Sequence, residues 1–145
     1  VYAHVAAEQA VRDLNTIDFS STPEPSPWDE VGTTDSDEGI IVSHNWDEIR
    51  RCMWNYVGIV RSNKRLARAK RRIEIISNEI QEYYWDFKIA PDLIELRNIA
   101  TVAELIVKCA VHRRESRGLH YNIEYPYKDD IRWKKDTIIR RAYVG

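Results

Sequence analysis

The stretch PDLIELRNIATVAELIVKCA, residues 91–110, is the strongest indication of how this chain of 145 residues folds. Its apolar residues recur at steps of three and four, the period that places them on one face of an α-helix. That stripe consists of Leu93, Leu96, Ala100, Ala103, Val107 and Ala110. Four further apolar residues lie beside it, namely Ile99, Val102, Ile106 and Cys109. We expect this helix to begin at Pro91, a position that proline favours, and to be the most buried one.

Two segments upstream show the same period. The apolar stripe of residues 44–60 is Trp46, Ile49, Met53, Val57 and Val60, and that of residues 64–85 is Leu66, Ala69, Ile73, Ile76, Ile80 and Tyr83. The polar residues 61–63 supply a turn between them. Because short connections make neighbouring helices antiparallel, the sequence predicts an all-α fold, an antiparallel three-helix bundle over residues 44–117.

The ends of this bundle have recognisable signals. Ser43 or Asn45 is suited to cap the first helix, since their side chains accept hydrogen bonds from free backbone N–H groups. Gly118 lies where a glycine in the left-handed conformation would stop the third helix. We therefore expect the third helix to continue to about Ser116.

The residues before the bundle fall into two parts. Residues 1–14 have helical spacing without a cap ahead of them, and we expect this helix to begin earlier in a longer parent chain, of which this chain is a fragment. Residues 15–43 contain three prolines and seven acids but no Lys or Arg. Such a composition predicts a flexible acidic linker, in which Trp28 and residues 40–42 are the expected anchors.

The residues after the bundle alternate differently. Tyr121, Ile123 and Tyr125 are separated by polar residues, which indicates a short extended strip. Residues 137–139 are a second extended candidate. We expect residues 118–145 to form an extended C-terminal tail.

The composition excludes several classes of protein. With 22 basic and 23 acidic residues, the net charge favours neither nucleic acid nor an anionic membrane as partner. No apolar run approaches the roughly 18 residues of a membrane span, and the first residues do not show the charged n-region and apolar h-region that are typical of a signal peptide. Cys52 and Cys109 lie in apolar helical patterns, so we expect reduced, buried thiols and a cytoplasmic location.

Two site hypotheses are weak. The basic run of residues 61–72 resembles an RNA-binding face, but its charges share the solvent side of an amphipathic helix, so a solvated or interdomain face is the better interpretation. Cys109, His112 and His120 fall short of a zinc site, which needs three or four ligands at closed spacing. We expect no metal site and no catalytic residue.

The stretch RRESRGLHYNIEYP, residues 113–126, is more specific. A plain helix stop explains a glycine flanked by basic residues, but it does not explain the acid, the histidine and the tyrosines as well. Guanidinium groups beside a carboxylate are suited to pairing with a partner surface. The residues that we expect to form an interdomain docking element are Arg114, Glu115, Arg117, Gly118, His120 and Tyr121.

Residues 114–126 of this stretch resemble the C-terminal signature of the L-aspartate oxidases, in the flavoprotein superfamily of succinate dehydrogenase and fumarate reductase. Leu119 and Tyr121 favour the aspartate oxidase branch. Residues 46–69 and 91–107 are similar to the first and third helices of the family's C-terminal domain. Residues 1–14 resemble the helix that closes its FAD-binding domain.

The resemblance implies a parent enzyme that binds FAD and oxidises L-aspartate to iminoaspartate, in NAD biosynthesis through quinolinate. It implies that the flavin-binding and capping domains of the same parent chain are the partners, with neither nucleic acid nor membrane involved. Because the chain has no G-x-G-x-x-G turn, we expect no FAD in this segment and no activity from it alone. The alternatives are the equivalent domain of a succinate dehydrogenase or fumarate reductase flavoprotein subunit, or a stand-alone helical interaction or RNA-binding module.

Overall fold

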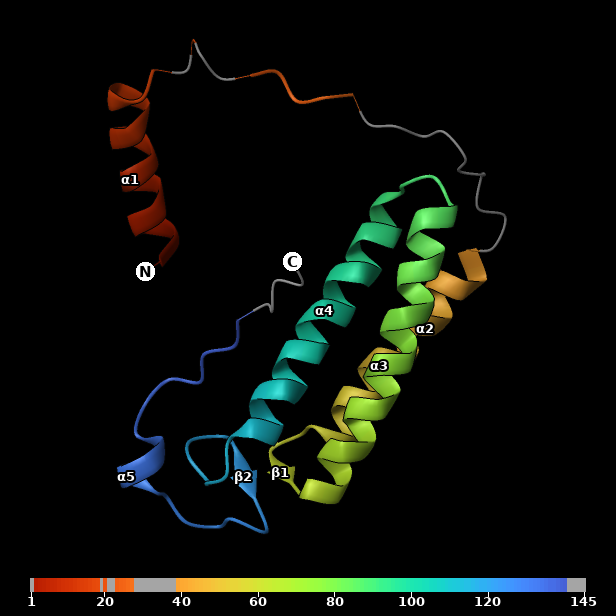
Figure 1. Cartoon of the computed structure of the whole chain (residues 1–145), viewed down its shortest axis with the longest axis vertical. Coiled ribbons are helices and arrows are strands. Elements are labelled where there is room, and N and C mark those ends of the chain that lie inside the picture. The colour runs from red at the N-terminus through yellow and green to blue at the C-terminus, as the bar shows by residue number, and fades with distance from the viewer. Residues whose placement is uncertain (1, 19, 21–22, 28–38, 141–145) are drawn as a thin grey trace.

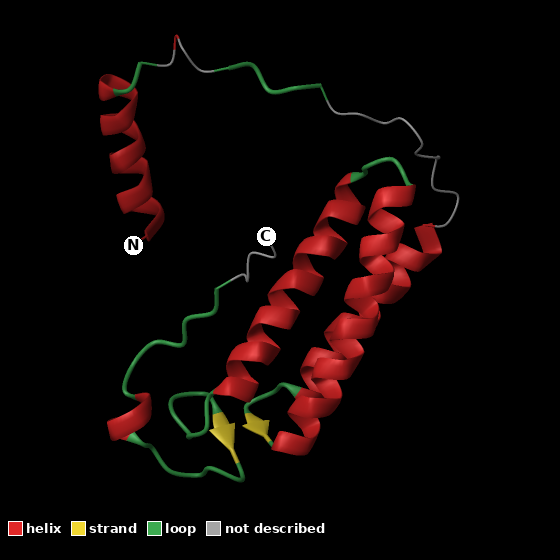
Figure 2. Ribbon diagram, viewed as in Figure 1, coloured by secondary structure: helices red, strands yellow, loops and turns green. Residues whose placement is uncertain are grey.

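Figure 1 shows the fold in a computed structural model that describes residues 2–18, 20, 23–27 and 39–140. In chain order the elements are α1 (Tyr2–Thr16), α2 (Gly39–Tyr56), β1 (Val60–Arg61), α3 (Asn63–Asp86), α4 (Pro91–His112), β2 (Tyr121–Asn122) and α5 (Asp130–Trp133). Helices dominate the described chain, and the two short strands form one pair (Figure 2). The predicted all-α class is confirmed.

The helices α2, α3 and α4 lie side by side, and each of them packs on the other two (Figure 1). The short connections reverse the chain between consecutive helices, as the loop of residues 87–90 does between α3 and α4. The predicted apolar stripes form the core, in which the side chains less than 2% exposed include Ile49, Leu66, Ile73, Ile80, Leu96 and Val107. The predicted antiparallel three-helix bundle is therefore confirmed.

The first bundle helix begins earlier than predicted. Since α2 starts at Gly39, the prediction that Ser43 or Asn45 caps it is wrong. Val42 precedes Ile49 by two helical turns on the same face, and both side chains belong to the core. The extra turn buries apolar surface, so the helix extends into the segment that composition alone assigns to the linker.

The other helix starts follow their sequence signals. The Ser62 hydroxyl accepts a hydrogen bond from the backbone N–H of Arg65 at 3.2 Å, which caps α3. Pro91 occupies the first turn of α4, as predicted. The second stripe of α4 is less buried than predicted, because Val102 and Ile106 remain 54% and 41% exposed.

The third bundle helix ends earlier than predicted. Arg113 already has extended backbone angles, so α4 stops at His112 and Gly118 is not its stop. Gly118 does adopt the predicted left-handed conformation, with φ 58°. It closes a turn between Arg117 and His120, whose backbones exchange hydrogen bonds of 2.9 and 3.1 Å. This early exit allows two arginines of the following segment to reach one buried carboxylate.

The segment after α4 forms a small sheet with the chain between α2 and α3. The strands β1 and β2 are parallel, with Val60 opposite Tyr121 and Arg61 opposite Asn122. The predicted extended strip is thus a strand over only two residues. Residues 137–139 join no strand in the described chain, and the tail includes the one-turn helix α5 instead of being extended throughout.

The described residues of α1 pack against no core. Its apolar side chains are exposed, among them Val5, Val11 and Leu14. Trp28 lies outside the described residues. No helix in the described ranges is both long and apolar enough to cross a bilayer.

Candidate docking site at one end of the bundle

The segment that follows α4 surrounds one fully buried carboxylate, that of Glu115. Arg117 donates from Nε to Oε1 of this carboxylate at 2.8 Å and from Nη2 to Oε2 at 3.1 Å. Arg113 also donates to Oε1. The backbone N–H of Asp129 adds a fourth hydrogen bond, at 2.9 Å. Together these donors engage both carboxylate oxygens.

The electrostatics of this carboxylate follow from its donors. The hydrogen bonds from Arg117, helped by those from Asp129 and Arg113, outweigh the opposing effect of burial and lower the pKa of Glu115 from 4.5 to about 2. Arg117 also pairs with Asp130, and both acids raise the pKa of its guanidinium. Glu115 therefore remains charged at neutral pH, and its partners are internal to the chain.

Arg113 connects the end of α4 to the tail. Besides Glu115, it donates to the carbonyl oxygen of Trp133 at 2.9 Å and to that of Lys135 at 2.5 Å. It also donates to the hydroxyl of Thr137 at 3.1 Å, and its guanidinium lies 5.9 Å from the centre of the Trp133 ring. One side chain thereby holds residues 133–137 against the bundle.

His120 connects the segment to β1. Its Nδ1 accepts a hydrogen bond from Nη1 of Arg61 at 2.7 Å, while its Nε2 lies 3.3 Å from the carbonyl oxygen of Arg113. Only a neutral imidazole with the proton on Nε2 satisfies both contacts. Burial, and then the neighbouring Arg61 charge, lowers the pKa of His120 below its usual 6.5, which favours this neutral form.

A second buried group lies beside β2. The Ser116 hydroxyl accepts from the backbone N–H of Asn122 at 2.9 Å and donates to the carbonyl of Tyr125 at 2.7 Å. The Asn122 amide donates to Oδ1 of Asn63 at 3.0 Å, and the Asn63 backbone N–H donates to Glu124 at 3.1 Å. The start of α3 and β2 are thus held together by side chains.

The structure sorts the predicted docking residues into two groups. Glu115, Arg117 and His120 are brought together, but as an internal cluster whose charges are already paired. Gly118 closes the turn beside them. Arg114 is exposed and makes no hydrogen bond or ion pair with any other described residue, and Tyr121 is 41% exposed. These two face solvent together with Leu119 and Ile123, which are 75% and 53% exposed.

The predicted docking residues do not include four residues that hold this end of the bundle together: Arg61, Asn63, Arg113 and Asn122. Arg61 and His120 are 59 positions apart, as are Asn63 and Asn122. No local pattern connects residues at that separation. Arg113 does adjoin the signature, and its two-residue spacing from Glu115 was an available signal.

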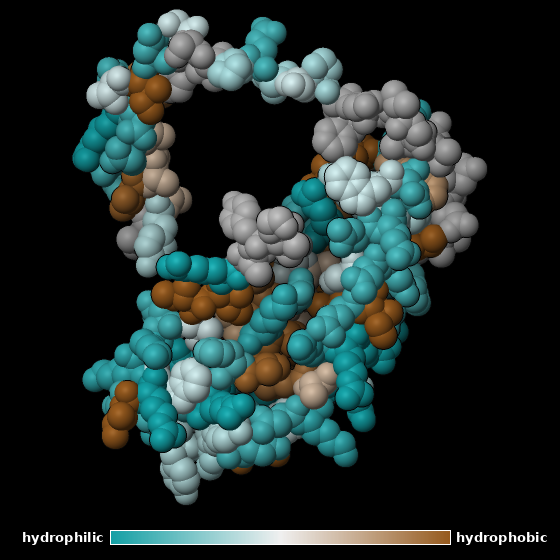
Figure 3. All heavy atoms as spheres, in the orientation of Figure 1, coloured by the Kyte–Doolittle hydropathy of each residue, from teal (hydrophilic) through white to brown (hydrophobic). Residues whose placement is uncertain are grey.

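An apolar hollow adjoins the cluster at β1. Its volume is about 830 Å³, and the Trp54 and Ile59 side chains on its rim are 85% and 58% exposed. Val60 and Ile106 line it as well. Hydrophobic side chains emerge among hydrophilic ones on the visible surface of the bundle (Figure 3). This end of the molecule therefore combines an internally hydrogen-bonded polar cluster with exposed apolar surface.

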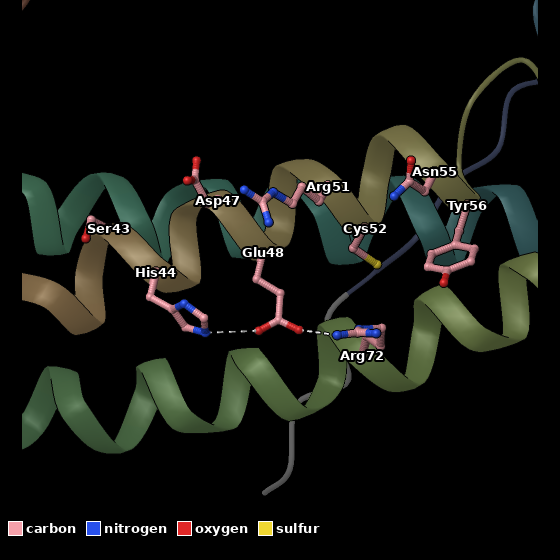
Figure 4. Close-up of a pocket in the computed structure, with 9 residues that line it drawn as sticks. All are labelled: Ser43, His44, Asp47, Glu48, Arg51, Cys52, Asn55, Tyr56 and Arg72. Carbon is pink, nitrogen blue, oxygen red and sulfur yellow. Dashed lines mark hydrogen bonds and ion pairs between the residues drawn. The ribbon is translucent and has the colours of Figure 1, made fainter.

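A second groove, of about 700 Å³, lies between α2 and α3 (Figure 4). Glu48 pairs there with Arg72 and lies 3.7 Å from His44. Burial raises the pKa of the Cys52 thiol in this groove, which disfavours the reactive thiolate. Cys109 is only partly buried, in contrast to the prediction. The described residues contain no cluster of three side chains suited to a metal ion.

The helical bundle and its buried signature define a class of protein. Residues 46–144 match the family described as the fumarate reductase flavoprotein C-terminal domain, and the chain belongs to this family. A solved structure described as Mycobacterium smegmatis Sdh1 in complex with UQ1 shares the fold, with a TM-score of 0.53. It is 22% identical and covers 86% of this chain and 19% of its own.

Within that class, the chain is similar to L-aspartate oxidases. It is 52% identical to the L-aspartate oxidase of Pseudomonas aeruginosa over 146 residues, which are 100% of this chain and 26% of that protein. The L-aspartate oxidase of Acinetobacter baylyi is 51% identical over 87% of this chain and 23% of its own length. The chain thus spans about a quarter of the length of these relatives, and the predicted resemblance is confirmed.

Proposed function

We propose that this chain is the C-terminal helical domain of an FAD-dependent L-aspartate oxidase, which converts L-aspartate to iminoaspartate in NAD biosynthesis. The observation that carries the proposal is the 52% identity to an L-aspartate oxidase along the whole chain, over only 26% of that protein's length. The rest of the parent chain would bind the flavin and the substrate in the cytoplasm.

The residues of this chain do not fit an FAD site. The five glycines are isolated, and none forms the G-x-G-x-x-G turn that approaches a pyrophosphate. The charged side chains of Arg113, Glu115, Arg117 and Asp130 at the bundle end are paired with each other. The role left to this domain is structural, with the flavin-binding and capping domains of the same parent chain as its partners.

The domain organisation of the proposal is as follows. Residues 1–14 belong to the flavin-binding domain, residues 15–43 connect the domains, residues 44–117 form the bundle, and residues 118–145 are the tail. The exposed apolar side chains of α1 support its assignment to a domain that is not present here. The early start of α2 shortens the connecting segment to about residue 38.

The docking surface of the proposal is the outer side of the cluster. The hydrogen bonds of Glu115 and Arg113 are made within the chain. These two side chains therefore hold the segment in a rigid shape and do not contact the partner domain themselves. Arg114, Leu119 and Tyr121 remain exposed, and Tyr121 lies opposite Val60, which lines the apolar hollow at β1. A charged group and apolar side chains on a rigid support are suited to an interdomain contact.

The test uses the full-length parent enzyme with Arg117→Ala. The substitution removes two hydrogen bonds to Glu115, so we expect the docking segment to loosen and both flavin retention and aspartate oxidation to fall. Arg132→Ala, an exposed arginine of α5, is the matched control. Wild-type flavin content and activity in Arg117→Ala would reject the docking role.

A second candidate is the equivalent domain of a succinate dehydrogenase or fumarate reductase flavoprotein subunit, which is supported by the match of residues 46–144 to the fumarate reductase flavoprotein C-terminal family. A parent that binds FAD covalently through a histidine and requires an iron–sulfur partner would support this candidate. Oxidation of L-aspartate by a purified single-chain parent would exclude it.

A further inference from the structure

One face of α3 carries segregated charges. Seven exposed residues at steps of three and four share this face, which we call the α3 outer stripe: Lys64, Arg68, Arg71, Ile75, Glu79, Glu82 and Asp86. The first three are basic and the last three are acidic. Ile75 lies at the centre, and its side chain is 59% exposed. The visible surface over α3 is largely hydrophilic (Figure 3).

Most of these charges lack a partner within the described chain. Lys64, Arg71 and the three acids make no ion pair or hydrogen bond with another described residue through their charged groups. Arg68 has only the face of the Tyr56 ring, at 5.7 Å. Charges next to the stripe behave differently, since Arg72 pairs with Glu48 on α2. The stripe therefore presents charged groups that are available to pair with another molecule.

The layout is also unfavourable for α3 alone. The first turn of α3 has no acid and its last turn has no base, so the charges oppose the helix dipole at both ends. Like charges at steps of three and four repel each other along the stripe. A helix that only faces solvent usually alternates the signs of its charges. These charge placements destabilise the isolated helix, which indicates that an interaction with another surface compensates for them.

We infer that the α3 outer stripe is a self-association surface, and that its partner is the α3 stripe of a second copy lying antiparallel to it. Antiparallel pairing places the basic half of one stripe opposite the acidic half of the other, in both directions at once. A two-fold axis beside Ile75 makes this contact self-complementary. The exposed isoleucines meet at the axis, and the opposed helix dipoles attract each other.

The dimensions limit the strength of such a pair. The stripe extends for about 33 Å, at about 1.5 Å per residue. Exposed ion pairs are individually weak and are screened by salt, so the dimer should be weak and should dissociate as ionic strength rises. The inference goes beyond the proposed function, since no stripe residue belongs to the Glu115 cluster.

The test uses the 145-residue chain and two charge-reversed variants, with sedimentation at several protein and salt concentrations. Arg68→Glu with Arg71→Glu makes the whole stripe acidic apart from Lys64 and Ile75, and Glu79→Arg with Glu82→Arg makes it mostly basic. The dissociation constant of the dimer should be at least about tenfold higher for each variant alone than for the wild type. The two variants mixed together should form a heterodimer at least as tight as the wild-type dimer.

The matched control is Lys128→Glu with Arg132→Glu, which makes the same change in net charge as Arg68→Glu with Arg71→Glu, but in the exposed tail. This control should associate like the wild type. Helical content and melting temperature show that every variant is folded. Because one reversed variant restores association of the other, a general loss of folding cannot produce the expected result.

Three results would overturn the inference. The wild-type chain could remain monomeric at low salt and high concentration. Association could persist unchanged in both reversed variants, which would place the interface elsewhere. The mixture could fail to associate although the wild type does, which would mean that the stripes do not face each other.

Discussion

Nη1 of Arg61 donates a 2.7 Å hydrogen bond to Nδ1 of His120, 59 positions later in the chain. Arg61 also donates to the carbonyl oxygens of Gly58 at 2.8 Å and Val57 at 3.2 Å. One arginine thus orders the connection after α2 and the turn that carries the signature. The short parallel sheet depends on this contact, since it has only two residues in each strand.

Substitution Arg61→Ala should loosen the sheet while the bundle stays folded. The backbone amide of Tyr121 donates to the carbonyl oxygen of Ile59 at 3.2 Å, and that of Ile123 donates to the carbonyl oxygen of Arg61 at 3.0 Å. We expect the hydrogen exchange of these two amides to accelerate in the variant. Amides in the middle of α4 should keep their protection. Arg65→Ala, an exposed side chain on the next helix, is the control. Unchanged exchange at Tyr121 would contradict the role of Arg61.

Substitution Glu115→Gln should destabilise the chain by about 2 kcal/mol, because it leaves the partly buried guanidinium donors of Arg113 and Arg117 without a charged acceptor. The midpoint of urea unfolding measures the change. Glu95→Gln removes an exposed carboxylate of α4 and should leave the midpoint almost unchanged. Equal midpoints for the two variants would show that the Glu115 cluster adds nothing to stability.

The same carboxylate predicts a dependence of stability on acid. The pKa of Glu115 is lowered to about 2 in the folded chain, from 4.5. The unfolded chain therefore binds the proton first, so the stabilisation is complete above about pH 4.5 and is lost as the pH falls toward 2. Unfolding free energies measured across this window should fall more steeply for the wild type than for Glu115→Gln. Parallel curves would contradict this prediction.

Substitution Gly118→Ala should destabilise the chain by about 1–2 kcal/mol, because φ at this position is positive and a β-carbon disfavours that conformation. An added β-carbon would meet no atom within 4 Å, so any cost arises from the backbone alone. Gly58→Ala is the control without a positive φ, although its β-carbon would lie 3.4 Å from a carbonyl oxygen. A smaller loss for Gly118→Ala than for Gly58→Ala, by thermal unfolding, would refute the expectation.

Much of the fold follows from local sequence. The buried stripes, such as Leu66 to Ile80 in α3, were predictable because helical period depends only on residues three and four positions apart. The left-handed glycine at position 118 was predictable for a similar reason, since its conformation is a local preference. The cap of α2 was mispredicted because polar residues that resemble a cap, such as Ser43, also occur inside a helix whose earlier turn can bury Val42.

The docking end of the molecule could not be predicted in the same way. Its signature residues were visible in the sequence, but whether Glu115 faces a partner or the interior depends on where Arg113 and Arg117 lie in space. Helix α4 ends at His112 instead of continuing to Ser116, and the following segment then pairs with β1 through strand β2. Contacts across 59 positions, such as that between Asn63 and Asn122, arise only when packed helices bring distant segments together. Local spacing specifies which face a side chain occupies, whereas the choice of its distant partner is made by the packing of the whole chain.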